Sequence, residues 1–234
     1  MGTPNLIMVA FGGRPEPPLA QHALPMRSLA RVVWSIVGDS SSTRNDQTPD
    51  LEDVIALAAD FPNVTGAMMD DFFHKPNQQG AVARYSAHQV AGFRQRLRAA
   101  PRPLDLWVVL YAHDLGLPIC DHLGQADIVS FWTWKSKDLG DLPDNFARAD
   151  PPAGGSPLAR KVLGCYMWDY GASQPMPAER MAYQSQTGLQ WLKEGRIEGM
   201  IFLASCICDL GLEAVEWARR WIADVGGQPL GRHP

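Results

Sequence analysis

Residues 64–73 read VTGAMMDDFF, a short apolar run that stops abruptly at Asp70 and Asp71. The same pattern, an apolar run that ends in acids, aromatic residues or a histidine, occurs at least three more times. The other runs are LWVVLYAHD (106–114), IVSFWTW (128–134) and VLGCYMWDY (162–170). Chemistry in parallel α/β proteins gathers at the carboxyl ends of strands. We therefore expect these four endings to contribute to one shared site.

Seven runs of apolar, β-branched or aromatic residues have the length of buried strands, and helical patterns separate most of them. These runs cover residues 5–11, 31–38, 64–70, 105–112, 127–133, 161–168 and 199–205. Alternating strands and helices predict a mainly parallel sheet with right-handed crossovers. The number of repeats favours a barrel over a short open sheet. The predicted fold is α/β, a TIM-like (β/α) barrel that is incomplete or has an irregular N-terminal strand.

Capping and periodicity patterns of α-helices support this alternation of strands and helices. Ser86 and Gln89 have the spacing of a capping box. The last helix is the clearest, because five apolar residues lie on one face at helical spacing: Ala214, Trp217, Ala218, Trp221 and Ile222. Two stretches, 12–25 and 135–160, are interpreted as long loops from their Gly, Pro and Asp content.

The composition narrows the class of protein. A chain of 234 residues with 46% hydrophobic residues can bury one large core, so we expect a single domain over residues 1–234. A net charge of −4 without a long basic run argues against a nucleic-acid surface. Apolar segments long enough to span a membrane or act as a signal peptide are not found, and we expect a cytoplasmic protein.

Four cysteines, Cys120, Cys165, Cys206 and Cys208, form neither a CxxC pair nor a zinc-like framework. Their simplest interpretation is reduced, buried thiols. We accordingly predict no resident metal and no cofactor.

Three carboxylates are the candidate catalytic residues. Asp70 and Asp71 are adjacent at a strand end, where their mutual repulsion can raise one pKa. Asp169 follows the run of residues 162–168, and an aromatic setting could tune its pKa for acid or nucleophile chemistry. Each of the three could instead cap a turn or pair with an arginine, and Asp39 is interpreted as a loop anchor.

Aromatic residues at the same strand ends are the candidate substrate-binding residues. Tyr111 and His113 share one strand face, and Trp132 and Trp134 share another. The remaining two candidates, in the fourth run, are Trp168 and Tyr170. Indole and phenol rings bind sugars well, although tryptophan is also an ordinary core residue.

At MDDFF (69–73) and YMWDY (166–170) the chain resembles bacterial TIM-barrel glycoside-hydrolase-like proteins, in which strand-end acids and tryptophans frame a sugar. The resemblance implies acid catalysis at a glycosidic bond by two carboxylates, and thus a carbohydrate-active hydrolase acting on a small saccharide or an oligosaccharide. The strand ends offer no glutamate, so the predicted pair is Asp169 with either Asp70 or Asp71.

Two alternatives remain open at this point. A metal-dependent sugar isomerase or hydrolase could use His113 with the strand-end aspartates. A barrel that binds saccharide through Trp132 and Trp134 without turnover would need no acid at all. The sequence indicates neither the glycan nor the oligomeric state.

Overall fold

The computed structural model of the protein describes residues 2–149, 160–203 and 205–229. The chain forms two compact units. The first unit comprises Pro4–Val109 and Leu117–Val129, and the second comprises the described residues of Met1–Thr3, Leu110–Gly116 and Ser130–Pro234. The single domain expected from the sequence stays a prediction, and each unit is described by itself.

All seven predicted strands are present, and their order in the sheet is their order in the chain. They are β1 (Asn5–Met8), β2 (Arg31–Val37), β3 (Val64–Met69), β4 (Asp105–Tyr111), β5 (Ile128–Trp132), β6 (Arg160–Tyr166) and β9 (Gly199–Leu203). The pairs β1–β2, β2–β3, β3–β4 and β6–β9 are parallel. Parallel strands in chain order with helices between them are the arrangement of a (β/α) barrel, here with seven strands among the described residues rather than eight. The predicted fold class, an incomplete TIM-like α/β barrel, is confirmed.

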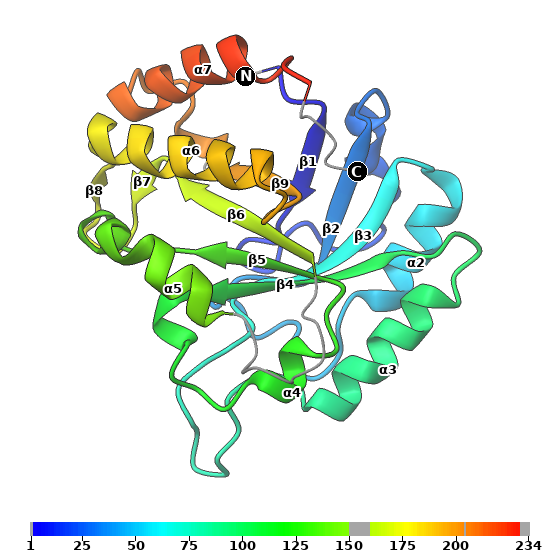
Figure 1. Ribbon diagram of the computed structural model, residues 1–234. Helices are drawn as coiled ribbons and strands as arrows, with labels where there is room; N and C mark the ends of the chain where they lie inside the picture. The colour runs from blue at the N-terminus through cyan, green and yellow to red at the C-terminus, as the bar shows by residue number, and fades with distance from the viewer. Residues whose placement is uncertain (1, 150–159, 204, 230–234) are drawn as a thin grey trace. The chain divides into compact units, whose positions relative to one another are not determined.

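In the first unit the helices lie between consecutive strands (Figure 1). They are α1 (Ala20–Ala23), the 3₁₀ turn η1 (Leu24–Met26), α2 (Leu51–Asp60), α3 (Ala87–Arg98) and α4 (Cys120–Leu123). Helix α2 buries Leu51, Val54 and Leu57, which recur at helical spacing. Helix α3 begins at the predicted capping box of Ser86 and Gln89.

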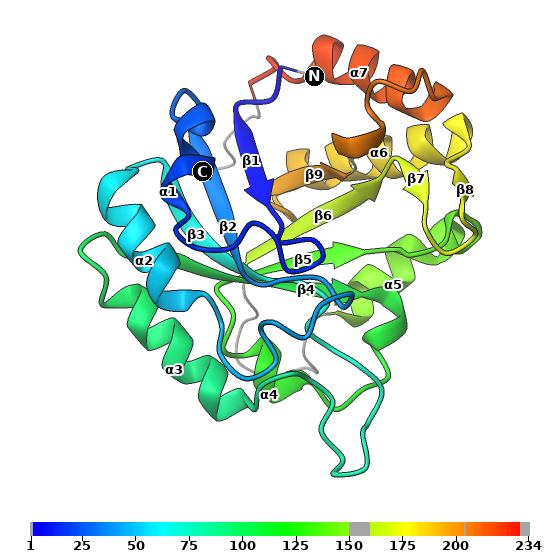
Figure 2. The same ribbon diagram turned by 180° about the vertical axis from the view of Figure 1, so that it is seen from behind.

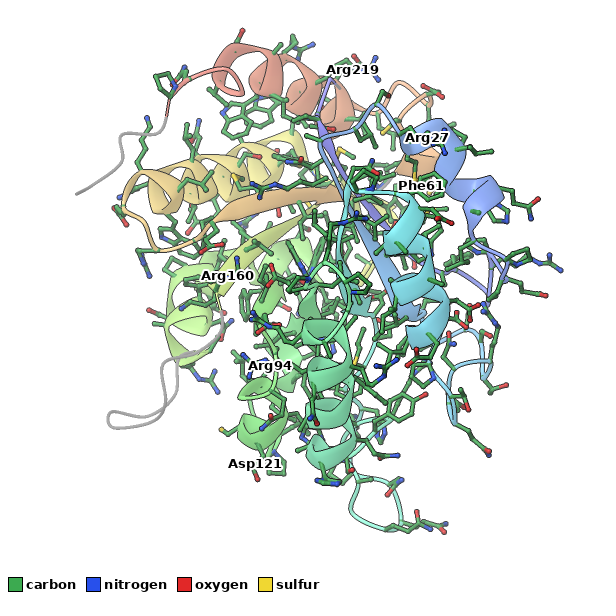
Figure 3. All side chains as sticks on the ribbon, turned by 90° about the vertical axis from the view of Figure 1, so that its right-hand side faces the viewer. Arg27, Phe61, Arg94, Asp121, Arg160 and Arg219 are labelled. Carbon is green, nitrogen blue, oxygen red and sulfur yellow. The ribbon has the colours of Figure 1, made fainter. Side chains whose placement is uncertain are left out.

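Two arginines of α3 pair with a buried carboxylate, and Arg94, labelled in Figure 3, is one of them. Asp127 is buried and accepts hydrogen bonds from Arg94 and Arg98, each at 2.6 Å. These two partners, with the backbone N–H of Leu106 at 3.0 Å, hold the pKa of Asp127 below its usual value. Arg94 and Arg98 of α3 therefore serve ion pairing with Asp127.

The second unit carries the remaining elements: the 3₁₀ turns η2 (Ala112–Asp114), η3 (Ser136–Asp141) and η4 (Ser205–Ile207), the helices α5 (Leu142–Arg148), α6 (Ala178–Lys193) and α7 (Glu213–Val225), and the short strands β7 (Trp168–Asp169) and β8 (Gln174–Pro175). Helices α6 and α7 pack side by side (Figures 1 and 2). Strands β7 and β8 form a small antiparallel hairpin after β6 (Figure 2).

Two sequence-based interpretations need correction. The stretch 135–160 was expected to be a loop, yet η3 and α5 occupy its first part, while 150–159 lies outside the described residues. Leu139, Leu142 and Phe146 are all buried and form a short apolar face. The Asp and Pro residues around them made the stretch resemble a loop in sequence. In the stretch 12–25, α1 and the beginning of η1 likewise form within the expected loop.

The thiols also differ from the expectation. Cys165 is fully buried, whereas Cys120 and Cys206 are exposed and Cys208 is half-buried, so the prediction of four buried thiols is wrong for three of them. On α7, Ala214 and Ala218 are buried as predicted, but the stacked rings of Trp217 and Trp221 stay partly accessible. None of the helices in the described residues has the length and apolar character needed to cross a membrane.

Candidate functional site

Three carboxylates follow strands β2 and β3 in the first unit: Asp39, Asp70 and Asp71. The two strands are parallel neighbours, so the residues after them meet at one edge of the sheet. The backbone N–H of Asp70 donates to the carbonyl oxygen of Val37 at 2.9 Å. Ser40 donates to Asp71 Oδ2 twice, from its N–H at 2.9 Å and from its hydroxyl at 2.8 Å. These contacts hold the two strand ends, with their acids, against each other.

Asp70 has an unusual electrostatic position. Burial raises the pKa of its carboxyl to about 7, and the charges of Asp71 and Asp39 add to this, while Arg84 acts in the opposite direction. The Asp70 carboxylate accepts a hydrogen bond from the Asp71 N–H at 3.0 Å, through Oδ1. A carboxyl group with a pKa near 7 can exchange a proton near neutral pH, as a general acid or base must.

The loops around the acids are fixed by the backbone. The N–H of Asp39 donates to the carbonyl oxygen of Ala10 at 3.0 Å. Gly38 makes this approach possible, because a Cβ at that position would lie 2.5 Å from the same oxygen. The Asp39 carboxylate accepts from the N–H groups of Gly12 at 2.9 Å and Ser41 at 3.3 Å. The prediction of Asp39 as a loop anchor is therefore confirmed.

In the second unit, aromatic residues that follow or end β4, β5 and β6 contact one another. This strand-end aromatic cluster consists of Tyr111, His113, Trp134, Tyr166 and Tyr170. The Trp134 ring stacks on Tyr170 at 5.6 Å between centroids and meets Tyr111 and Tyr166 edge to face at 5.7 and 5.8 Å. Such offset and edge-to-face geometries are the favourable ones for aromatic pairs.

Three residues of the cluster, His113, Trp134 and Tyr170, are partly or largely accessible to solvent. His113 stacks on Tyr111 at 5.0 Å with an interplanar angle of 6°, and 59% of its side chain is exposed. Trp134 and Tyr170 are half-buried, and burial raises the pKa of the Tyr170 hydroxyl. The hydroxyl of Tyr166 donates to the hydroxyl of Tyr111 at 3.3 Å. The cluster thus offers ring faces and hydroxyl groups together, which suits the apolar face and the hydroxyl groups of a sugar.

Trp132 is buried and packs against Tyr166 of the cluster. Trp132 is only 4% exposed, its ring centroid lies 4.8 Å from that of Tyr166, and its Nε1 donates to Ser130 Oγ at 3.1 Å. Gly164 on β6 leaves the space for this indole, since a Cβ there would lie 2.0 Å from Trp132 Cδ2. Trp132 is therefore a buried support, and only Trp134 of the predicted pair offers a ring to a ligand.

We expect Gly164→Ala to destabilise the protein by about 1–3 kcal/mol, because the indole of Trp132 must move and no flexible side-chain end can yield. Urea unfolding measures the effect, and near-ultraviolet circular dichroism should change with it, since the displaced indole contacts Tyr166. Gly140→Ala is the matched control, because a Cβ at Gly140 meets nothing within 4 Å. Equal stability of the two variants would contradict the tight contact.

Asp169 lies in β7 and is 1% exposed. Its Oδ2 accepts from the N–H and the hydroxyl of Ser136, at 3.1 and 2.5 Å, and its Oδ1 accepts from the N–H of Ala172 at 3.0 Å. Both carboxylate oxygens are thus occupied by donors of the protein itself. These bonds join the segment after β5 to the β7–β8 hairpin.

The structure brings together some of the predicted site residues. Four of the six predicted binding residues, Tyr111, His113, Trp134 and Tyr170, join the cluster, and Trp132 contacts it through the ring of Tyr166. Trp168 is half-buried in the hairpin and has no ring contact within the described parts of the chain. Asp70 and Asp71 belong to the first unit and Asp169 to the second.

Sequence reasoning missed Tyr166 as a site residue. Its ring contacts three others, those of Trp132, Trp134 and Tyr170, and its hydroxyl donates to that of Tyr111. The alternation along β6 was the available signal, because it places Tyr166 on the face opposite Cys165 and Met167. Among the residues that the structure describes, three or more His, Cys, Asp or Glu side chains do not come together in a way that could hold a metal ion.

The fold is that of an α/β protein with the strand order of an incomplete (β/α) barrel, and its strand ends carry acids in one unit and aromatic rings in the other. No family model matches the chain, and no curated protein matches it either. Solved structures provide only distant similarities.

Three of these structures show which kinds of protein are similar to this chain. An FMN-binding β-glucuronidase from Facaelibacterium prausnitzii is 10% identical with a TM-score of 0.47, over 80% of this chain and 30% of that one. A putative lyase/mutase from Burkholderia cenocepacia is 14% identical with a TM-score of 0.44, over 97% and 80%. A mutant of xylanase A from P fluorescens subsp. cellulosa, in complex with xylopentaose, is 11% identical with a TM-score of 0.48, over 92% and 96%. This chain thus spans less than a third of the β-glucuronidase chain, and the fold assignment rests on strand order and pairing.

Proposed function

We propose that the protein is a carbohydrate-active hydrolase that cleaves a glycosidic bond with strand-end aspartates. The observation that carries this proposal is the carboxyl group of Asp70, whose pKa is raised to about 7 beside a second carboxylate, Asp71. Glycoside hydrolysis needs one carboxyl group that holds its proton near neutral pH and a second carboxylate nearby. Two adjacent carboxyl groups in different surroundings fit these two roles.

In the proposed reaction, Asp70 donates its proton to the glycosidic oxygen as the bond between that oxygen and the anomeric carbon breaks. A water molecule adds to the anomeric carbon and releases a proton, which restores the protonated acid. Asp71, held in place by Ser40, is the carboxylate that we assign to the stabilisation of positive charge on the sugar ring. Asp169 stays a prediction as the second carboxylate, and its three hydrogen bonds within the protein favour Asp71.

The strand-end aromatic cluster supports a saccharide as the ligand. A sugar ring has an apolar C–H face, which packs on indole and phenol rings, and hydroxyl groups, which bond to a polar tip such as that of Tyr111. In Trp134 and Tyr170 the cluster has two stacked, half-buried rings for such a face.

The direct test is hydrolysis of a defined panel: the pentasaccharides of β-1,4-linked xylose, glucose, mannose and N-acetylglucosamine, with release of reducing ends as the readout. Turnover that disappears with Asp70→Asn supports the proposal. Turnover that is the same in wild type and in Asp70→Asn would assign the chemistry to other residues.

We expect Trp134→Ala to weaken binding of the recognised pentasaccharide about tenfold or more, because the variant removes the ring that joins Tyr111, Tyr166 and Tyr170. Isothermal titration calorimetry measures the affinity. Trp217→Ala is the matched control, since Trp217 is also a half-buried, stacked tryptophan of the second unit but lies on α7. An unchanged affinity in Trp134→Ala would remove the cluster from the binding site.

A second candidate function is saccharide binding without turnover, and the accessible aromatic cluster favours it independently of any acid. Calorimetry and the hydrolysis assay together distinguish the two functions. Binding without reducing-end release over a broad pH range would favour the binding protein over the hydrolase.

A further inference from the structure

Phe11 is the most exposed large apolar residue of the described chain, with 75% of its surface accessible. It stands at the tip of the loop that follows β1, where Phe11 and Arg14 exchange two backbone hydrogen bonds, at 2.9 and 3.0 Å. Gly12 and Gly13 between them have φ angles of 57° and 77°, which favour glycine. The tip is therefore a closed turn with a defined shape.

The turn is fastened to the rest of the first unit at several points. The Gly12 N–H donates to Asp39 Oδ1 at 2.9 Å. Arg44 Nη1 donates to the carbonyl oxygens of Gly13 at 2.8 Å and Pro15 at 3.1 Å. Arg44 is itself held by a two-oxygen ion pair with Asp50, with both contacts at 2.6 Å. Exposure of Phe11 is thus a property of an ordered loop, since its backbone is fixed on both sides.

The same contacts place the loop beside the acids. Asp39, which holds Gly12, lies close enough to Asp70 for its charge to raise the pKa of the Asp70 carboxyl. Ser40, the next residue, donates twice to Asp71. A chain of direct contacts therefore runs from the Phe11 turn through Asp39 and Ser40 to the proposed catalytic pair.

We infer that Phe11 is a substrate-binding residue of the first unit, whose ring packs against the C–H face of a sugar bound at the carboxyl ends of β1, β2 and β3. This inference rests on the proposed function and adds the residue that would recognise the sugar next to the acid. An aromatic ring on an ordered loop binds without the entropic cost of ordering the loop. Its large apolar surface, left open to water in the unbound protein, is covered when the sugar binds.

The test compares wild type with Phe11→Ala, Phe11→Trp and Leu24→Ala by calorimetry with the four pentasaccharides named above. Leu24 is the matched control, because it is an exposed apolar residue of the same unit, 53% accessible, in η1. We expect Phe11→Ala to weaken binding about tenfold, Phe11→Trp to retain it, and Leu24→Ala to leave it unchanged. Melting temperatures should agree among all four proteins, because the Phe11 side chain is exposed.

The outcomes separate this inference from the function on which it rests. If wild type hydrolyses a pentasaccharide and Phe11→Ala binds and hydrolyses it equally well, Phe11 is not a binding residue and the proposed function stands. If wild type neither binds nor hydrolyses any of the four, both are overturned. Weaker binding in Phe11→Ala, with rescue by Phe11→Trp, supports Phe11 as a binding residue, and reducing-end release by wild type on the same pentasaccharide supports the proposed function with it.

Discussion

Asp70→Asn is expected to lower turnover by about 10²- to 10⁴-fold at pH 6, the range over which a positioned general acid contributes. The amide has nearly the size of the carboxyl group, but its N–H protons are not acidic enough to be transferred to a leaving glycosidic oxygen. Substrate affinity should change far less than turnover, because the acid acts chiefly in the transition state. Initial rates and calorimetric affinities on the same pentasaccharide measure the two effects separately.

The same residue predicts the pH dependence of activity. Wild-type turnover should fall as the pH rises above about 7, because Asp70 then loses the proton that it must donate. Any residual activity of Asp70→Asn should lack this decline. A wild-type rate that stays level from pH 6 to pH 9 would contradict the assignment of Asp70 as the acid.

The contribution of Asp70 to the free energy of unfolding should fall as the pH rises, whereas an aspartate with a lowered pKa contributes more as the pH rises. The pKa of Asp70 is raised from 3.8 to about 7 in the folded protein, so the unfolded chain releases this proton first as the pH rises. The stabilising contribution is complete below about pH 4, declines between about pH 4 and 7, and is lost above pH 7, a change on the order of 4 kcal/mol. In Asp70→Asn this decline should vanish, so the variant should be more stable than wild type at pH 8.

Urea unfolding at pH 5 and pH 8 tests this sign. Asp121→Asn is the control, because Asp121 is an exposed aspartate of α4 in the same unit. The control should follow the pH dependence of wild type, whereas Asp70→Asn should not. Parallel curves for all three proteins would indicate that Asp70 titrates as an ordinary surface carboxylate.

The strands were predictable because their cause is local. Each of the seven runs is a continuous apolar stretch bounded by polar or turn residues, and a buried parallel strand needs that pattern. Helix α5 was missed because its apolar face is short, and the Asp and Pro residues around it resemble a loop. Its burial depends on Phe146 packing on Phe131 and Trp191, contacts that the local pattern does not contain.

The site was predictable only to the level of residue type at strand ends. The Tyr111 and His113 rings do stack, and Trp132 and Trp134 both contact Tyr166. However, β4 ends at Tyr111 and β5 at Trp132, so His113 and Trp134 lie beyond the strands and these contacts do not follow from strand alternation. The pattern could not show that Trp132 is buried and Trp134 is accessible. That difference depends on how Gly164 of β6 makes room for one indole.

The sequence likewise could not predict which of the two adjacent aspartates has the raised pKa. Asp70 and Asp71 are neighbours of the same type, and nothing in their order indicates which is desolvated. In the folded chain Ser40 donates to Asp71, while burial and the charges of Asp71 and Asp39 act on Asp70. The environments of adjacent carboxylates are therefore decided by loops from β2, distant in the sequence.

We expect Asp169→Asn to lower the free energy of unfolding by about 2–4 kcal/mol. Both oxygens of the buried Asp169 carboxylate accept hydrogen bonds, including those from the N–H groups of Ser136 and Ala172. Asparagine offers one acceptor oxygen and one NH₂ group, so one of these N–H donors must face another donor. Urea unfolding measures the loss, and Asp138→Asn is the control, because Asp138 in η3 is only half-buried.

The consequence for sugar binding follows from what Asp169 joins. Asp169 and its partner Ala172 flank Gly171. The Gly171 N–H donates to the carbonyl oxygen of Trp134 at 3.2 Å, and a Cβ at Gly171 would lie 2.7 Å from Trp134 Cδ1. Loss of the Asp169 bonds should therefore loosen Trp134 and weaken saccharide binding together with stability. A catalytic Asp169 predicts the reverse pattern, in which turnover is abolished while melting temperature and affinity stay at wild-type values. Melting temperature, affinity and turnover of Asp169→Asn, measured on one preparation, thus decide whether this carboxylate holds the site together or takes part in its chemistry.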